Sequence, residues 1–191
     1  DSRVVTDSLV GYLEGAAYDD PDIKAIVSYT GNWDDSAKGK ELALVQYNAG
    51  ADVVSQLASN AGVGVFEAAK ETGKLAIGSD TDQSLIFAES DPDKAAAILT
   101  SSLKRVDTSL LRAYELYKQG QVPYGTCEKL GLDKECVGIV ENDYFKAHVS
   151  EEDAAAIAQA KQDIIDGKIT VSSSYGMTTE ELAAFKDQYI K

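Results

Sequence analysis

A regular alternation of short β-branched runs with helical segments constrains the fold of this chain most strongly. Runs that predict strands occupy residues 23–29, 51–58 and 74–80. The segments between them, 36–49 and 63–72, carry apolar residues at helical spacing and end before Gly50 and Gly73, as helices often do. Strands joined through a helix run parallel. The alternation therefore predicts an α/β fold with a parallel sheet flanked by helices.

Outside this alternation the pattern is less regular. Segment 6–18 places Leu9, Leu13 and Ala16 on one face and predicts a helix whose preceding strand is absent or cut short. Beyond residue 82 the rhythm changes. Segment 91–120 predicts one long helix, capped by Asp91 and with a potential break near Asp107. Lys104 would lie on this helix.

The C-terminal third predicts further short elements. A strand is expected at 137–141, a helix at 150–165 that ends before Gly167, and an edge strand at 169–172. Thr178 and Glu181 have the spacing of a capping box for a last helix. We therefore expect residues 1–82 to form a ligand-binding α/β lobe. Residues 83–191 would supply the long helix, the loop, the strand and the C-terminal helices that complete the lobes and crossovers.

The charge of the chain excludes some partners. Lys and Arg number 18 against 32 Asp and Glu, which gives a formal net charge of −14. A protein of this charge repels polyanions, so nucleic acid and anionic lipid are poor partners. No apolar run approaches the roughly 20 residues that cross a bilayer. The chain begins at Asp1 with neither an initiator Met nor a signal segment, which predicts a processed or trimmed form.

Cys127 and Cys136 are the two cysteines, and both fall in the irregular segment 125–138. We expect a disulfide between them, which would place the protein outside the cytoplasm, and two free thiols are the alternative. A zinc site is not expected, because His148 is the sole histidine and no C-x-x-C spacing occurs.

A ligand site is expected where the predicted parallel strands end, because connecting loops and helix N-termini converge there. The three loops concerned are 29–35, 58–64 and 79–83. Each contains polar, aromatic or glycine residues, and all three belong at one edge of the sheet. The sequence therefore predicts a crevice for a flat, polar and uncharged ligand.

The first two loops offer different contacts. Trp33 would give an aromatic ligand a flat apolar face, although it could equally pack over the next helix, which Asp34 or Asp35 would cap. Gly62 would allow a ligand to approach the backbone at a helix N-terminus, whereas Asn60 could be a plain N-cap. No basic residue accompanies this glycine-rich loop, so it does not predict a phosphate site.

The third loop contains Asp80 and Asp82. A carboxylate at a strand end can accept two hydrogen bonds from a vicinal diol such as ribose. Three alternatives remain from the residues alone: Asp82 caps a turn, both side chains are solvated, or the pair binds a metal as in sugar-nucleotide enzymes. Lys104, taken alone, is a solvated surface lysine.

The chain resembles the basic membrane protein family of ABC-transporter substrate-binding lipoproteins, whose members include purine-nucleoside binders. The strings that carry the resemblance are GYLEGA, IVSYTGNWDDSAKGKELA, GADVVSQLASNAGVGVFEAAKE, IGSDTDQ, ILTSSLKRVD and IIDGKITV. The resemblance implies a type I periplasmic-binding fold, incomplete at the N-terminus because family members are much longer. It implies that Trp33 flanks the base, with Asp35, Asn60 and Gly62 nearby, and that Asp80 and Lys104 hold the ribose hydroxyls.

The function implied is that of the extracytoplasmic solute-binding component of an ABC importer, lipid-anchored in its full-length form and read by a membrane permease. Such a protein needs no cofactor, metal or catalytic residue. Two alternatives remain: a cytoplasmic ligand-sensing regulatory domain of the same fold, and a metal-dependent sugar-nucleotide enzyme that uses Asp80 and Asp82.

Overall fold

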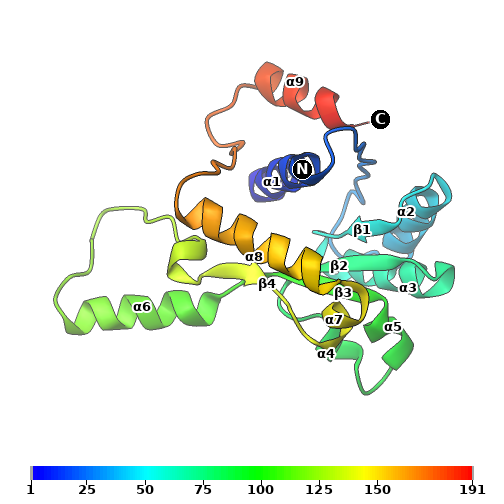
Figure 1. Ribbon diagram of the computed structural model, residues 1–191, viewed down its shortest axis with the longest axis horizontal. Coiled ribbons are helices and arrows are strands. Elements are labelled where there is room, and N and C mark those ends of the chain that lie inside the picture. Colours follow the sequence, from blue (N-terminus) through cyan, green and yellow to red (C-terminus); the bar gives the residue numbers. More distant parts are fainter. Residues whose placement is uncertain (1, 191) are drawn as a thin grey trace.

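The computed structural model describes residues 2–190 and has a four-stranded sheet in the order β1-β2-β3-β4 (Figure 1). β1 (Val53–Ser55), β2 (Leu75–Asp80) and β3 (Ile98–Lys104) run parallel to one another, and β4 (Val137–Ile139) pairs antiparallel with β3. The predicted α/β fold with a mainly parallel sheet and flanking helices is confirmed.

The core lies between the sheet and two helices that the sequence predicted closely. α2 (Ser36–Asn48) and α3 (Val63–Thr72) pack against each other, and the short 3-10 helix η1 (Ser59–Gly62) leads into α3. Phe66 of α3 is fully buried, and it meets Phe87 edge-on with ring centroids 6.0 Å apart. Gly73 ends α3 with a φ of 65°, the left-handed conformation typical of a C-terminal glycine.

The predicted long helix over 91–120 is wrong. The chain instead forms α4 (Ser84–Phe87), α5 (Pro92–Ala96), strand β3 and then α6 (Val106–Lys118). β3 lies between β2 and β4, and Ile98, Thr100 and Ser101 are all buried in it. A strand covered on both faces has no clear polar alternation, so its residues resemble a stretch of buried helix.

α6 projects from the rest of the molecule, as Figure 1 shows, and none of its residues is buried. After it come the short 3-10 helix η2 (Leu132–Lys134) and β4. The disulfide expected in this region is not formed: both cysteines are free thiols. Cys127 is exposed in the loop, whereas Cys136 is only 3% exposed and its Sγ lies 3.3 Å from the Lys134 carbonyl. The two thiols thus occupy different environments, one in solvent and one in the protein interior.

The remaining helices are α1 (Arg3–Asp19), α7 (Asp143–His148), α8 (Glu151–Ile165) and α9 (Thr179–Tyr189). The Thr178 and Glu181 capping box is confirmed. Segment 169–172 is not a strand. Residues 172–174 instead form hydrogen bonds to side chains of α1. Glu14 accepts hydrogen bonds from Ser172, and Asp7 accepts them from Ser173 and Ser174.

The first predicted strand, 23–29, is also absent as a strand. The segment is extended, but its one bridge is Ala25 to Ile190, because the end of α9 lies beside it. Its carbonyl at Ile26 accepts a hydrogen bond from Gln46 of α2 at 3.1 Å. Within residues 2–190, no helix has both the length and the apolar character needed to cross a membrane.

Candidate functional site

The three loops predicted to meet at the carboxyl edge of the sheet do so, through direct hydrogen bonds. The Ala61 amide donates to the Trp33 carbonyl at 2.9 Å, which joins the first loop to the second. Asn60 Nδ2 adds a side-chain bond to Asp34 Oδ1 at 3.3 Å. Because main-chain and side-chain bonds both link them, the first two loops form one continuous surface.

A buried polar network ties the second loop to the third. Gln56, at the end of β1, donates to Gln83 Oε1 at 2.6 Å and to Ser79 Oγ at 3.3 Å. Gln83 Oε1 also accepts a hydrogen bond from the Ser79 backbone amide. The backbone amide of Gln83 donates to Ser101 Oγ of β3 at 3.3 Å. Sequence analysis missed this network, although Gln56 within the predicted strand 51–58 and Gln83 in the loop after the predicted strand 74–80 were its available signals. The network holds the ends of three strands in fixed relation.

Asp80 and Lys104 face each other at the ends of neighbouring strands. Lys104 Nζ lies 2.8 Å from Asp80 Oδ1, and both side chains remain largely exposed, at 64% and 58%. The two meet because β2 and β3 pair in a register that puts Asp80 opposite Leu103. Asp80 has a φ of 69°, which costs free energy for a residue with a side chain. The pair thus presents an accessible oxygen and an ammonium side by side.

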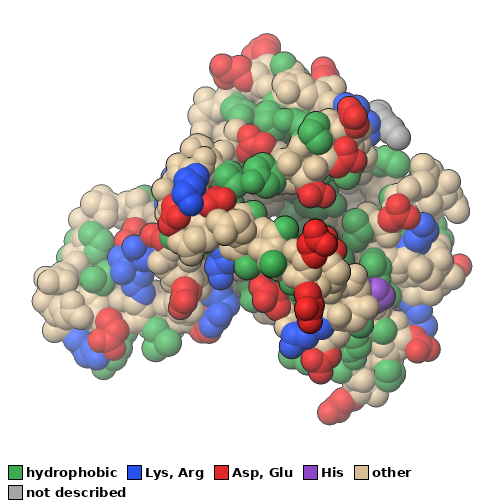
Figure 2. All heavy atoms as spheres, in the orientation of Figure 1, with side chains coloured by type: hydrophobic (Ala, Val, Ile, Leu, Met, Phe, Trp, Pro, Cys, Tyr) green, Lys and Arg blue, Asp and Glu red, His purple; other side chains and the backbone are tan. Residues whose placement is uncertain are grey.

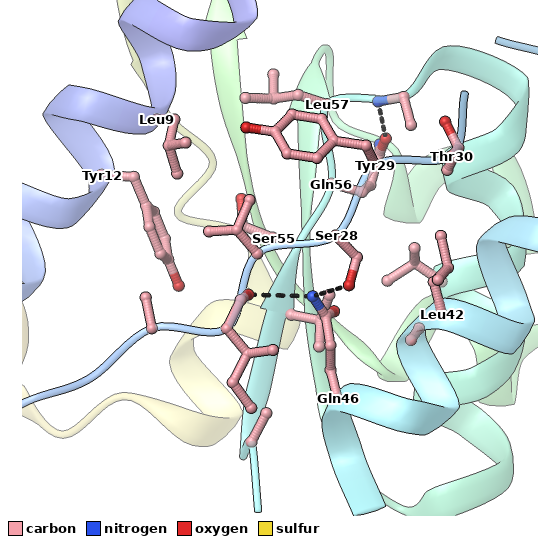
Figure 3. Close-up of a pocket in the computed structure, with 18 of the residues that line it drawn as sticks. Leu9, Tyr12, Ser28, Tyr29, Thr30, Leu42, Gln46, Ser55, Gln56 and Leu57 are labelled. Carbon is pink, nitrogen blue, oxygen red and sulfur yellow. Dashed lines mark hydrogen bonds between the residues drawn. The ribbon is translucent and has the colours of Figure 1, made fainter. Parts of the chain in front are cut away.

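Trp33 lies at the rim of a cavity of about 720 Å³ that continues between α1, α2 and β1. The indole is half exposed, at 50%, so one part of it remains open to solvent or ligand. Figure 3 shows the interior of this cavity, with Leu9 and Tyr12 of α1 on one side and Leu42 and Gln46 of α2 on the other. Of the ligand-binding residues predicted from the sequence, Trp33 lines this cavity, whereas Asp35, Asn60, Gly62, Asp80 and Lys104 do not.

Asp35 has a structural role. It is the N-cap of α2, and its Oδ1 accepts the Lys38 amide at 2.9 Å. The preceding Asn32 holds the turn by accepting the amides of Asp34 and Asp35 through Oδ1. The contacts of Asp35 are therefore those of a helix N-cap, as one of the sequence interpretations expected.

The glycines of the second loop serve close packing. A Cβ on Gly62 would lie 1.9 Å from Gln56 Oε1, and a Cβ on Gly64 would lie 1.9 Å from the Ser36 carbonyl. Gly62 is buried, whereas the side chain of Asn60 is exposed at the loop surface. Ser59 adopts a φ of 53°. The loop is therefore tightly built around its backbone, with Asn60 as its available polar side chain.

Asp82 is a tether within the fold. Its Oδ1 accepts a hydrogen bond from the Ser84 hydroxyl at 2.6 Å, and its Oδ2 accepts one from Asn142 Nδ2 at 3.0 Å. Asn142 is the N-cap of α7. Asp80 and Asp82 thus have different partners and do not converge on one point. Across residues 2–190, no group of three or more His, Cys, Asp and Glu side chains is arranged to hold a metal ion.

The edge of the sheet combines a flat indole, an exposed carboxylate–ammonium pair and a glycine-built loop. His148, the sole histidine, is exposed at the end of α7. Acidic side chains are spread over the face shown in Figure 2, and a hollow separates the part formed by α1 and α9 from the sheet. These features are those expected of an α/β ligand-binding domain whose binding surface lies beyond the carboxyl ends of a parallel sheet.

The chain belongs to the family described as ABC transporter substrate-binding protein PnrA-like, whose sequence model matches residues 1–174. It is 37% identical over 182 residues to the ABC transporter nucleoside-binding protein BmpA of Lactococcus lactis, covering 90% of this chain and 50% of that protein. The chain thus spans about half the length of this relative.

Two solved structures share the fold. An ABC transporter solute-binding protein from Aeropyrum pernix matches with a TM-score of 0.73 and 25% identity, over 93% of this chain and 58% of that one. A transcriptional activator of the comK gene from Bacillus halodurans matches with a TM-score of 0.70 and 25% identity, over 84% and 53%. The fold therefore occurs both in a solute-binding protein and in a transcriptional activator, and function has to be argued from the site.

Proposed function

We propose that this chain forms one wall of a nucleoside-binding site in an ABC-type solute-binding protein, and that the nucleoside is a purine nucleoside. The observation that carries the proposal is the exposed Asp80–Lys104 pair at the ends of two adjacent parallel strands. A ribose offers two neighbouring hydroxyls, each of which can donate and accept a hydrogen bond. A carboxylate accepts from such a diol, and an ammonium donates to it.

Trp33 supports the assignment of the base. Its half-exposed indole stands in the loop that is bonded directly to the glycine-built loop. Stacking of a base on an aromatic side chain contributes about 1–3 kcal/mol. Asn60, exposed and beside Asp34, offers a side-chain amide for a hydrogen bond to the base edge. The name of the Lactococcus relative, a nucleoside-binding protein, agrees with this class of ligand.

The wider setting follows from the family. We propose that the complete protein lies outside the cytoplasm on a lipid anchor, closes two lobes over its ligand, and is read by a membrane permease. In this proposal residues 1–82 supply most of the wall of the site, Lys104 of β3 adds the ammonium, and the other later elements complete the lobes and crossovers. A single wall leaves much of the ligand in water, so this chain alone should bind weakly.

The proposal is tested by titrating the purified, isotope-labelled chain with guanosine and following amide chemical shifts by NMR. Asp80→Asn should weaken binding by about 10- to 100-fold, because hydrogen bonds to charged groups contribute about 1.5–3 kcal/mol. 2′-Deoxyguanosine should bind the unaltered chain more weakly than guanosine, since one hydroxyl of the diol is missing.

Asp52→Asn is the matched control. Asp52 forms an exposed ion pair with Lys74 at 2.5 Å, directly before β1 and β2 and thus at the opposite edge of the sheet. This variant loses the same kind of charge without touching the proposed site, so its affinity should stay unchanged. Equal affinity of the Asp80→Asn and Asp52→Asn chains would contradict the proposal.

A further inference from the structure

Asp80 lies at the centre of a turn that residues other than glycine rarely adopt. The Thr81 amide donates to the Ser79 carbonyl at 2.8 Å, and Asp80 between them has a φ of 69°. A hydrogen bond between residues two apart, around a residue of positive φ, is a γ-turn of the rare and strained kind. Such a backbone persists only where the surrounding contacts determine it. The contacts that hold this turn therefore decide where the Asp80 carboxylate points.

The Gln83 side chain holds the residue before Asp80. β1 pairs with β2 as far as Ile77, whose carbonyl accepts the Gln56 amide at 3.1 Å. Successive strand residues point their main-chain groups to alternate edges, so the Ser79 amide is the next one that points towards β1. Gln83 Oε1 accepts this amide at 2.7 Å. The Gln83 carboxamide thus takes the place that a further residue of β1 would have.

Gln56 fixes the position of that carboxamide. Its Nε2 donates to Gln83 Oε1 at 2.6 Å, its Oε1 accepts the Ala58 amide at 3.0 Å, and the residue is only 3% exposed. A Cβ on Gly78 would lie 2.7 Å from Gln83 Oε1, so the glycine leaves the space that the carboxamide occupies. Hydrogen bonds enclosed in this way are stronger than those in water. The Gln83 oxygen therefore has a fixed position between Gln56 and Ser79.

We propose that Gln83 is a positioning residue for the ribose: its carboxamide oxygen holds Ser79, and thereby the turn that directs the Asp80 carboxylate towards Lys104. The inference rests on the proposed function, because it concerns the geometry of the pair that would hold the diol. Gln83 acts without touching the ligand. A displacement of about 1 Å takes a hydrogen bond out of its range, so the Gln83 contact sets the preference of the site for ribose over deoxyribose.

The first measurement needs no nucleoside. Gln83→Met replaces the carboxamide by an apolar chain of similar length, so the Ser79 amide loses its acceptor. The Thr81 amide, which closes the turn, should then exchange with solvent at least about tenfold faster than in the parent chain, as measured by NMR. Thr100→Val is the matched control, because it removes a buried bond of β3, from Thr100 Oγ1 to the Val140 carbonyl at 2.7 Å. It should leave the Thr81 rate unchanged.

The second measurement is the ratio of the dissociation constants of 2′-deoxyguanosine and guanosine, from NMR titration. The ratio should be about ten or more in the parent chain and about two or less in Gln83→Met, because the Asp80 carboxylate no longer meets the diol. Gln83→Glu keeps an oxygen acceptor at the same place and should retain the ratio. Gln83→Asn withdraws the oxygen by one methylene, and it is read like Gln83→Met if that variant does not fold.

The outcomes separate this inference from the proposed function. Unchanged Thr81 exchange in Gln83→Met, or faster exchange with an unchanged ratio, would overturn the inference and leave the proposed function intact, since a merely structural residue weakens both ligands equally. Loss of the ratio in Thr100→Val would also overturn it, because any loss of stability would then suffice. A ratio that Asp80→Asn leaves unchanged would contradict the proposed function itself, and this inference with it.

Discussion

At the scale of single residues, the candidate site depends on side chains whose exposure is set by their neighbours. Asp80 and Asp82 are two positions apart, yet Asp82 is bound by Ser84 and Asn142 whereas Asp80 remains open beside Lys104. The residue pattern alone did not separate their roles, whereas the family resemblance assigned the ribose to Asp80. Only the register between β2 and β3 brings Lys104 to Asp80, and sequence analysis had placed that lysine on a helix.

Replacement of Trp33 tests the proposed stacking. Trp33→Ala should lower the affinity for guanosine by about 5- to 100-fold, because stacking on one aromatic ring contributes about 1–3 kcal/mol. Trp33→Tyr should retain most of the affinity, and the thermal midpoints of both variants should stay close to that of the parent chain. The affinities are measured by the same NMR titration, and a Kd unaffected by Trp33→Ala would remove this residue from the site.

Ser59 tests the strain in the glycine-built loop. Its φ of 53° is one that glycine adopts at little cost, so Ser59→Gly should stabilise the fold by about 0.5–1 kcal/mol. Ser8, which is exposed within α1, is the control, and Ser8→Gly should destabilise the fold by a similar amount. Urea denaturation measures both changes, and a loss of stability on Ser59→Gly would show that the serine side chain has another role.

At the scale of elements, the sequence predicted those with a regular period and failed where burial or distant contacts decide. α3 was predicted over its full range, and α2 to within one residue, because a one-sided apolar stripe and a glycine stop mark them. β3 is buried on both faces and so was taken for helix. Segment 23–29 has strand-like residues, but pairing needs a neighbour, which no local pattern supplies.

Tyr47 joins two elements and gives the fold a dependence on alkaline pH. Its hydroxyl, on α2, donates to the Leu75 carbonyl at 2.8 Å, and burial raises the pKa of Tyr47 above its ordinary value of 10.0. A raised pKa means that the folded state favours the protonated hydroxyl. Its contribution is therefore fully present below pH 10 and is lost as the pH rises from 10 towards the folded-state pKa.

Tyr47→Phe should accordingly lower the free energy of unfolding by about 1 kcal/mol at pH 7. The difference between the parent chain and this variant should shrink between about pH 10 and pH 11.5. Urea denaturation at a series of pH values measures it. A difference that stays constant up to pH 11.5 would show that the Tyr47 hydroxyl does not titrate differently in the folded and unfolded states.

At the scale of the whole molecule, the candidate site lies at the carboxyl ends of the parallel strands, and β1 is an edge strand of their sheet. Three strand-end loops meet as the sequence predicted, and Lys104 at the end of β3 pairs there with Asp80 of the third loop. Helix α6 has no buried residue and a cavity lies beside β1, and the chain spans about half the length of the Lactococcus relative. Weak binding with the correct specificity is the behaviour expected of such a site.

The central claim is that the Asp80–Lys104 pair holds the ribose of a nucleoside while Trp33 flanks its base. A crystal structure of the chain grown with guanosine tests it most directly. We predict ribose hydroxyl oxygens at hydrogen-bonding distance, about 2.6–3.2 Å, from both an Asp80 carboxylate oxygen and Lys104 Nζ, with the purine against the Trp33 ring. A guanosine bound elsewhere on the chain, or bound at this edge with its ribose turned away from Asp80, would contradict the account.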